Sequence, residues 1–470
     1  MKTNSDEMHN QEMLLKKIRQ SSEVFDKLAN SYEVWVPESG WLAGRRNRDK
    51  NDSKRKNLTD WSILSFLLEI DNCHYPMADS YLQYGIDGVI RIAAETLETL
   101  KNNLQSELQD QTQLDIAYLE SLLHVWKRFR QFVADHMVLA LECAKQETSD
   151  TKKKRYEKIA KICQNLTINK PNTFCEALQL FWFTYLFRSP FGAGCIGRLD
   201  QLLYPFYKHD CEMGIWDQQE AEKMLEEMFA RMNEINTGDT LRNLMLSGQD
   251  AKGNDQTNEI TYLILVAYEN TGGSEPHLNV RFHEKTPKKL RDNCINMLSS
   301  GSGQPTIYFD EAVLPAMEKA GICHEDACQY ANDGCTETVI AGKSAIVFWQ
   351  YEMVKTVELT LFGGNENPCV KPVSMKKNSI HGADFVPKTN LLIGIESKKP
   401  QELTTFSEFL SAFFEQMDHQ LDHYFLMIKQ KMQEDQTVSI TSPFTAGTFE
   451  KCLRTGKDPL RGGGFDITNY

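Results

Sequence analysis

Apolar residues in the first third of the chain recur every three or four positions, the spacing of an amphipathic helix. The pattern predicts an N-terminal helix over residues 7–29 and a helical region over residues 58–144, in which charged residues separate the apolar ones. Residues 36–57 are rich in Gly, Arg, Asn, Asp and Lys and predict an exposed loop. We therefore expect residues 1–150 to form a mainly helical N-terminal region of packed amphipathic helices.

The pattern changes after residue 150. An apolar helix is predicted over residues 174–187, with Thr173 as its N-cap and Glu176 completing a capping box. Short strands are then predicted at 243–248, 276–283 and 306–310, and they alternate with helices at 259–269, 288–299 and 311–319. This order indicates α/β construction with parallel strands over residues 151–470, for which closure into a barrel is one arrangement. Functional residues in such folds come from several of the loops at the strand ends.

The strand predicted at 276–283 alternates strictly in polarity. One face carries apolar side chains and the other carries His277, Asn279, Arg281 and His283. Two interpretations stay open from the pattern: a half-exposed strand with a wet polar face, or a polar row that lines an internal cavity. Further along, helices are predicted over residues 344–362 and 405–433, an exposed linker between them, and strand or loop over 437–449.

Composition and charge exclude several classes of protein. The net charge of -13, without a long basic stripe, argues against nucleic acid as a partner. No run of 18 apolar residues appears and the start lacks the apolar core of a signal peptide, so we expect no membrane segment and a cytoplasmic location. The twelve cysteines are scattered, without C-x-x-C pairs or zinc-type spacing, which is typical of reduced thiols.

One cysteine stands in an unusual context, the turn of residues 332–338 (Asn-Asp-Gly-Cys-Thr-Glu-Thr). If the residues after Gly334 are extended, Cys335 and Glu337 point to the same side. Cys335 as a nucleophile would need a histidine, which His277 or His283 offers. A metal site would need further ligands at short spacing, which are missing. A thiol beside a carboxylate also suits one-electron chemistry, in which the carboxylate moves a proton.

The segment Gly334-Cys335-Thr336-Glu337 resembles the Gly-Cys-x-Glu motif of the glycyl radical enzymes, the superfamily of pyruvate formate-lyase and of several dehydratases. Further matches follow in the family's order along nearly the whole chain. They are the helix that begins Thr173-Phe174-Cys175-Glu176, the segment Gly197-Arg198-Leu199-Asp200-Gln201, the strand that ends Val280-Arg281-Phe282-His283, the loop 301–305, and the glycine-rich residues 456–464.

The resemblance implies a ten-stranded β/α barrel of two half-barrels, of which this chain would hold the first half and the start of the second. Cys335 would become a thiyl radical that abstracts hydrogen from a small-molecule substrate, and Glu337 would move a proton. Asp200 would be a pocket carboxylate, and Arg198, Arg281 and His283 are further candidates for binding the substrate. The pyruvate formate-lyase reaction itself is disfavoured, because that enzyme has a Cys-Cys pair where Gly334 stands here.

The resemblance also implies partners. Family members continue into a C-terminal domain that holds the radical glycine in an Arg-Val-x-Gly-Tyr type motif, which this sequence lacks. We therefore expect no cofactor bound in this chain, and a glycyl radical on a separate chain, installed by an S-adenosylmethionine radical activase. The alternative is a truncated, non-catalytic homologue that acts as a binding or interaction protein. A homo-oligomer is left open.

Overall fold

The computed structural model describes residues 4–45, 66, 78–102, 109–188, 195–234, 242–272, 275–333, 336–346, 353–365, 394–438, 440–464 and 467–469. The chain divides into two compact units, one of residues 1–346 with 439–469 and one of residues 347–438. They are described separately below. The division expected from the sequence near residue 150 stays a prediction.

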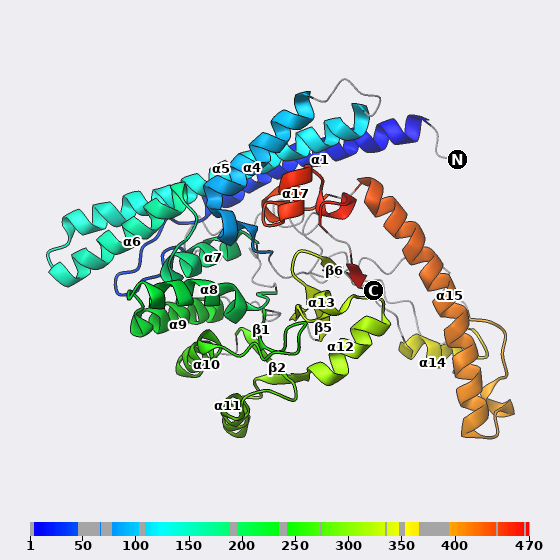
Figure 1. Cartoon of the computed structure of the whole chain (residues 1–470). Helices are drawn as coiled ribbons and strands as arrows, with labels where there is room; N and C mark the ends of the chain where they lie inside the picture. Colours follow the sequence, from blue (N-terminus) through cyan, green and yellow to red (C-terminus); the bar gives the residue numbers. More distant parts are fainter. Residues whose placement is uncertain are drawn as a thin grey trace, which may run out of the picture. The chain divides into compact units, whose positions relative to one another are not determined.

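Long helices form the N-terminal part of the first unit (Figure 1). They are α1 (Asn4–Ser31), α4 (Ser80–Asn102), α5 (Gln109–Gln146) and α6 (Asp150–Ile168), and α5 packs against the other three. The helices predicted at 7–29 and within 58–144 are thereby confirmed for the residues described. Their core is aromatic, and Trp126 stacks on Phe444 with ring centroids 5.1 Å apart. Phe444 lies in the short helix α16 (Pro443–Ala446), so the prediction of strand or loop is wrong there.

The apolar helix α7 (Phe174–Arg188) begins where the capping residues predicted it. The Glu176 N–H donates to Thr173 Oγ1 at 3.2 Å, and the Thr173 N–H donates to the Glu176 carboxylate at 3.3 Å. Nearly all side chains of α7 are buried, as expected for a helix that is apolar on every side. Helices α8 (Leu199–Glu212) and α9 (Gln218–Glu234) follow in the chain and pack against it.

A buried histidine in α5 makes the stability of this unit depend on pH. The Trp35 N–H donates to His136 Nε2 at 3.2 Å, and Nδ1 lies 2.8 Å from the Phe132 carbonyl. Burial lowers the pKa of His136 to about 4. Between about pH 6.5 and pH 4, His136 is therefore protonated in the unfolded chain but neutral in the folded chain. Because protons bind the unfolded state more tightly, the free energy of unfolding falls as the pH falls through this range.

We expect acidification from pH 7 to pH 5 to lower the free energy of unfolding by about 2 kcal/mol through His136 alone. Urea unfolding at the two pH values measures this change, and a His136→Gln variant should lack that part of it. The matched control is His124→Gln, a change at a half-exposed histidine of the same helix, which should keep the part of the change that His136 contributes. If the free energy of unfolding fell by the same amount between pH 7 and pH 5 in all three proteins, His136 would not be the source of the pH dependence.

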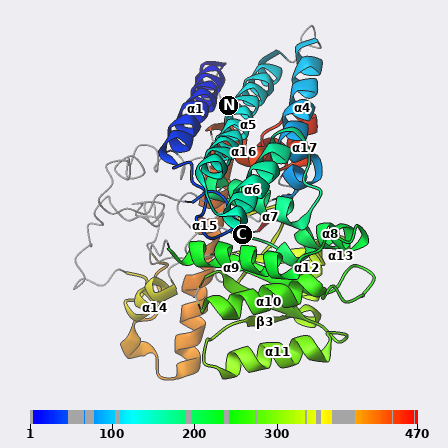
Figure 2. The ribbon, with the colours of Figure 1, turned by 90° about the vertical axis from the view of Figure 1, so that its left-hand side faces the viewer.

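Three parallel strands form a sheet in the order β1 (Asn243–Ser247), β2 (His277–Phe282) and β3 (Thr306–Phe309). Helices α10 (Glu259–Thr271), α11 (Lys288–Ser299) and α12 (Asp310–Lys319) alternate with them, which confirms the predicted strands and helices (Figure 2). Leu244 pairs with Leu278, and Leu246 pairs with Val280. These four side chains belong to the main hydrophobic core, which also contains apolar residues of α10.

An antiparallel hairpin packs against the opposite face of this sheet. It consists of β4 (Tyr330–Asp333) and β5 (Glu337–Ile340), after the short helix α13 (His324–Ala327), and we call residues 330–340 the cysteine hairpin. Its side chains form a second apolar cluster with Met245 of β1. Three members of the polar row of β2 therefore lie inside the protein, with Asn279 2%, Arg281 0% and His283 6% exposed, whereas the His277 side chain at the start of the strand is 44% exposed. The interpretation as a wet, half-exposed face is therefore wrong for Asn279, Arg281 and His283 and holds only at His277.

The last described residues of the first unit form one strand of a short parallel pair. β6 (Ser344–Ile346) pairs in parallel with β7 (Ile467–Asn469). The helix predicted over residues 344–362 is wrong for its first residues, because the partner of β6 lies more than 120 residues away and no local pattern reveals it. The helix α17 (Glu450–Thr455) and the 3-10 turn η4 (Pro459–Arg461) precede β7.

The second unit contains α14 (Met353–Leu361), the 3-10 turn η3 (Pro400–Glu402) and α15 (Phe406–Val438). The long helix confirms the prediction over 405–433. The buried Gln416 of α15 exchanges hydrogen bonds with both backbone groups of Ile395, and Thr356 of α14 donates to Gln420. Residues 366–393 of the predicted linker lie outside the described residues.

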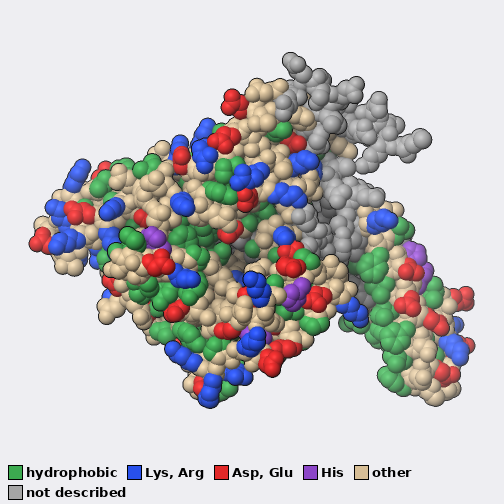
Figure 3. Space-filling model, in the orientation of Figure 1, with side chains coloured by type: hydrophobic (Ala, Val, Ile, Leu, Met, Phe, Trp, Pro, Cys, Tyr) green, Lys and Arg blue, Asp and Glu red, His purple; other side chains and the backbone are tan. Residues whose placement is uncertain are grey.

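Charged side chains of both signs are interspersed over the face shown in Figure 3. In the part of the chain that the structure describes, no helix is long and apolar enough to cross a membrane. The cysteines within the described ranges are free thiols, some exposed, such as Cys211 and Cys323, and others buried, such as Cys195 and Cys328.

Candidate active site

The cysteine turn proves to be the connection of an antiparallel hairpin. Asn332 pairs with Thr338 and Asp333 with Glu337, so that residues 334–336 join the two strands. Gly334 and Cys335 lie outside the described residues, and the predicted placement of Cys335 relative to Glu337 stays a prediction. Glu337 is half-buried, and its carboxylate accepts the Thr336 N–H at 3.0 Å. Asn332 and Asp333 are fully buried on the other strand.

Arg281 of β2 holds the base of this hairpin. Its Nε and Nη2 donate to the two carboxylate oxygens of Asp310, each at 2.8 Å, and both side chains are completely buried. Nη1 donates to the carbonyls of Cys328 and Tyr330, at 2.8 and 3.2 Å. The guanidinium carbon lies 4.0 Å from the centre of the Tyr330 ring, whose hydroxyl donates to Asp310 at 3.0 Å. Arg281 therefore donates hydrogen bonds to Asp310 on one side and to the segment that leads into the hairpin on the other.

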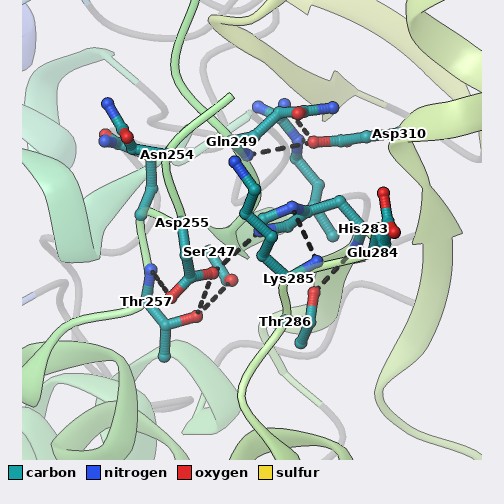
Figure 4. A network of polar contacts seen from close by, with 12 residues as sticks. Ser247, Gln249, Asn254, Asp255, Thr257, His283, Glu284, Lys285, Thr286 and Asp310 are labelled. Carbon is teal, nitrogen blue, oxygen red and sulfur yellow. Dashed lines mark hydrogen bonds and ion pairs between the residues drawn. The ribbon is translucent and has the colours of Figure 1, made fainter. Parts of the chain in front are cut away.

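Asp310 starts α12 immediately after β3 and also receives the Gln249 N–H at 3.0 Å, a contact drawn in Figure 4. Between Gln249 and β1 stands Gly248, with a φ of +97°. A Cβ at this position would lie 2.4 Å from the Nε of Arg281, so only glycine lets the guanidinium pass this close to the backbone. The carboxyl ends of the three parallel strands thus meet around one buried ion pair.

Arg198 and Asp200 stabilise the end of β1 from the start of α8. Ser247 has a φ of +62°, an uncommon conformation for a residue with a side chain. Its N–H donates to Asp200 at 2.8 Å and its carbonyl accepts from Arg198 Nη2 at 2.9 Å. The Thr261 hydroxyl also donates to Asp200, at 2.7 Å. Local strain at the end of a strand is thereby held by two buried charged groups.

Arg198 reaches the hairpin as well. Its Nη1 donates to the Cys328 carbonyl at 3.2 Å and to the Gln329 side chain at 3.0 Å. Burial, followed by the positive charge of Arg281, lowers the pKa of Arg198 to about 10. Burial raises the pKa of Asp200, and the charge of Arg198 opposes this shift. Two guanidinium groups and two carboxylates therefore balance each other in one buried network.

His283 lies just after β2 in a neighbouring network (Figure 4). Its Nε2 is 2.9 Å from Asp255 Oδ1, and Asp255 also accepts the Thr257 hydroxyl at 3.0 Å. Thr257 is in turn 2.8 Å from the Ser247 hydroxyl. The Lys285 N–H points to His283 Nδ1 at 3.4 Å. These contacts join the loop after β1 to the end of β2.

Of the residues predicted from the sequence, the structure brings Arg198, Asp200 and Arg281 together beneath the hairpin, with His283 nearby. The described contacts of all four are made within the protein, and their assignment to substrate binding stays a prediction. Sequence reasoning missed Asp310 and Tyr330. Asp310 had a usable signal, since it is a carboxylate directly after a predicted strand, whereas nothing local marks Tyr330 as its partner. Within the described ranges, no three His, Cys, Asp or Glu side chains are grouped to hold a metal ion.

Comparison with known proteins identifies the family to which the chain belongs. Residues 72–467 match the family model described as pyruvate formate lyase-like. The chain belongs to this family. Its relatives include a glycyl radical subunit, and the glycyl radical enzyme superfamily predicted from residues 334–337 is confirmed.

Two curated members of the family illustrate the relationship. The chain is 30% identical over 355 residues to trans-4-hydroxy-L-proline dehydratase of Clostridioides difficile, which covers 70% of this chain and 42% of the relative. It is 26% identical over 398 residues to (2S)-3-sulfopropanediol dehydratase of Klebsiella oxytoca, covering 81% of this chain and 45% of the relative. The chain thus spans somewhat less than half the length of these pyruvate formate lyase-like relatives.

A solved structure confirms the fold. A glycyl radical enzyme from Archaeoglobus fulgidus superposes with a TM-score of 0.75 and 20% sequence identity, over 97% of this chain and 64% of the other. The predicted fold class, the β/α barrel of the glycyl radical enzymes over the portion that this chain spans, is therefore confirmed.

Proposed function

We propose that this chain is the thiyl-bearing part of a glycyl radical lyase that catalyses radical elimination from a small polar metabolite. The observation that supports the proposal is the cysteine hairpin, whose two strands carry residues on either side of the cysteine turn, pack against the parallel sheet through Met245 and pair Glu337 with Asp333. The carboxyl ends of parallel strands are where ligands bind in such folds. The dehydratase names of the relatives support a substrate with a hydroxyl group to eliminate.

The proposed chemistry needs one hydrogen-atom transfer and one proton transfer. The sulfur of Cys335, as a thiyl, takes a hydrogen atom from a substrate C–H bond, which forms S–H and leaves the unpaired electron on that carbon. Glu337 accepts the proton of the adjacent hydroxyl, because a ketyl-type radical expels its neighbouring group more readily once that proton has left. The leaving group takes this proton back from the Glu337 carboxyl and departs as water or an amine, and the product radical recovers its hydrogen from the Cys335 thiol, which restores the thiyl. A glycyl radical supplies the oxidising equivalent for Cys335.

The proposed partners are a chain that carries the glycyl radical domain and an S-adenosylmethionine radical activase. Strict anaerobic reconstitution of the three proteins, followed by electron paramagnetic resonance, tests this proposal. The expected result is a glycyl doublet and substrate-dependent turnover with trans-4-hydroxy-L-proline or (2S)-3-sulfopropanediol, the substrates named for the two relatives, as the first probes. A doublet with no turnover on any hydroxylated probe would favour the alternative, a homologue that acts as a binding protein.

We expect Glu337→Gln to lower kcat by about 10²- to 10⁴-fold, since general acid–base catalysis contributes an effect of this size. The amide keeps the shape of the side chain but cannot take up a proton. The glycyl doublet should persist, and KM should change little. Glu325→Gln is the control, because Glu325 is an exposed carboxylate close in sequence. Equal activity of the Glu337 variant and wild type would contradict the proton-transfer role.

A further inference from the structure

The buried ion-pair network lies in the fold between the sheet and the cysteine hairpin. Its hairpin-side contacts come from four residues, Arg198, Arg281, Asp310 and Tyr330, which we call the clamp. Arg198 precedes α8, Arg281 lies in β2, and Asp310 follows β3. Three separate elements therefore converge on the single stretch of chain at Cys328–Tyr330, which ends on the first residue of β4.

We propose that the clamp residues are positioning residues for the reacting cysteine. The guanidinium groups of Arg198, before α8, and of Arg281, in β2, both donate to the carbonyl of Cys328. Arg281 adds a hydrogen bond to the Tyr330 carbonyl and covers the face of the Tyr330 ring at 4.0 Å. A strand fixed at its first residue by charged donors has little freedom to slide, and Cys335 follows that residue by five positions.

The contacts of the clamp matter because they help to hold the register in which β4 pairs with β5. A slip of one residue between β4 and β5 would turn every side chain of the strand to the opposite face. Asn332 and Asp333 would then exchange surroundings, and Glu337 would lose its place opposite Asp333. Only Tyr330 and Ala331 of β4 belong to the second apolar cluster, and the following Asn332 and Asp333 are polar, so the charged contacts at the start of the strand carry much of the register. A misplacement of about 1 Å at a reacting group costs about 10²-fold in rate.

This inference rests on the proposed function only for the role of Cys335, and the fixation itself can be tested without radical chemistry. Tyr330→Phe removes the hydroxyl that donates to Asp310 and keeps the ring. Amide hydrogen exchange, read by mass spectrometry on peptides covering 328–340, should become about fivefold faster in this variant, the loss of one buried hydrogen bond. Exchange in β1 and α10 should stay within twofold. Arg198→Lys, which keeps the charge but loses the planar fork, should act on the same peptides.

The matched control is Tyr32→Phe, since Tyr32 donates an equally buried hydroxyl to the Leu186 carbonyl at 2.7 Å, far along the chain from the hairpin. It should leave exchange in 328–340 unchanged. In the reconstituted enzyme, Tyr330→Phe should lower kcat about tenfold or more with KM unchanged, whereas Tyr32→Phe should change neither.

Unaltered exchange of the hairpin peptides in both Tyr330→Phe and Arg198→Lys would overturn the inference, whatever the activity shows. Faster exchange with unchanged kcat would overturn the positioning role as well. If wild type gives no turnover, the proposed function fails while the exchange result still decides whether the clamp holds the hairpin.

Discussion

Replacing Cys335 by Ser is expected to abolish turnover of the reconstituted enzyme, a loss of at least about 10⁴-fold, comparable to removal of a reacting group in other enzymes. The physical reason is that an alcohol O–H bond is much stronger than a thiol S–H bond, so the serine hydroxyl does not give up its hydrogen to form the radical that the hydrogen-atom transfer needs. The glycyl doublet of the partner chain should remain, because its formation does not involve Cys335. Turnover assays and electron paramagnetic resonance on the same sample measure both effects.

The control for this variant is Cys323→Ser. Cys323 is exposed and lies twelve positions earlier in the sequence, so its loss should leave turnover and the doublet unchanged. If Cys335→Ser retained activity, the thiyl assignment would fail. Loss of the doublet together with turnover would instead give Cys335 a part in assembling or activating the partner chain, contrary to the role proposed here.

Asp310→Asn is expected to lower the free energy of unfolding of the first unit by about 3–5 kcal/mol. The carboxylate is 0% exposed and binds both Nε and Nη2 of Arg281, so the amide would leave a guanidinium charge buried without its counter-charge. The positive charge of Arg198 lies in the same network and would increase the penalty. Urea unfolding followed by tryptophan fluorescence measures the change.

The exposed ion pair between Lys288 and Asp292 provides the comparison, with its atoms 2.6 Å apart and side chains 82% and 50% exposed. Asp292→Asn should change stability by less than about 0.5 kcal/mol, because solvent screens exposed pairs. If Asp310→Asn cost no more than this control, the buried network would not be a determinant of stability. The same variant should also show faster amide exchange at residues 328–340, in line with the role of the clamp.

Local signals in the sequence predicted correctly those features that depend on a single helix, strand or motif. The capping residues Thr173 and Glu176 predicted the start of α7, and the polarity patterns predicted the three parallel strands and their helices. The Gly-Cys-x-Glu motif identified the superfamily. In each case the information lies within a few residues of the chain, in the spacing of apolar side chains or in a short motif.

Only the tertiary structure decided what surrounds these elements. The polar row of β2 has the alternation of a surface strand, yet Arg281 in it is buried, because the segment that leads into a hairpin some 50 residues later covers it and supplies its carbonyl partners. Ser344–Ile346 became a strand because its partner comes from residues 467–469. The sequence alone determined the fold class and the motif. Which charges meet beneath the motif depended on long-range pairing, since hydrogen bonds between distant segments leave no periodic trace along the chain.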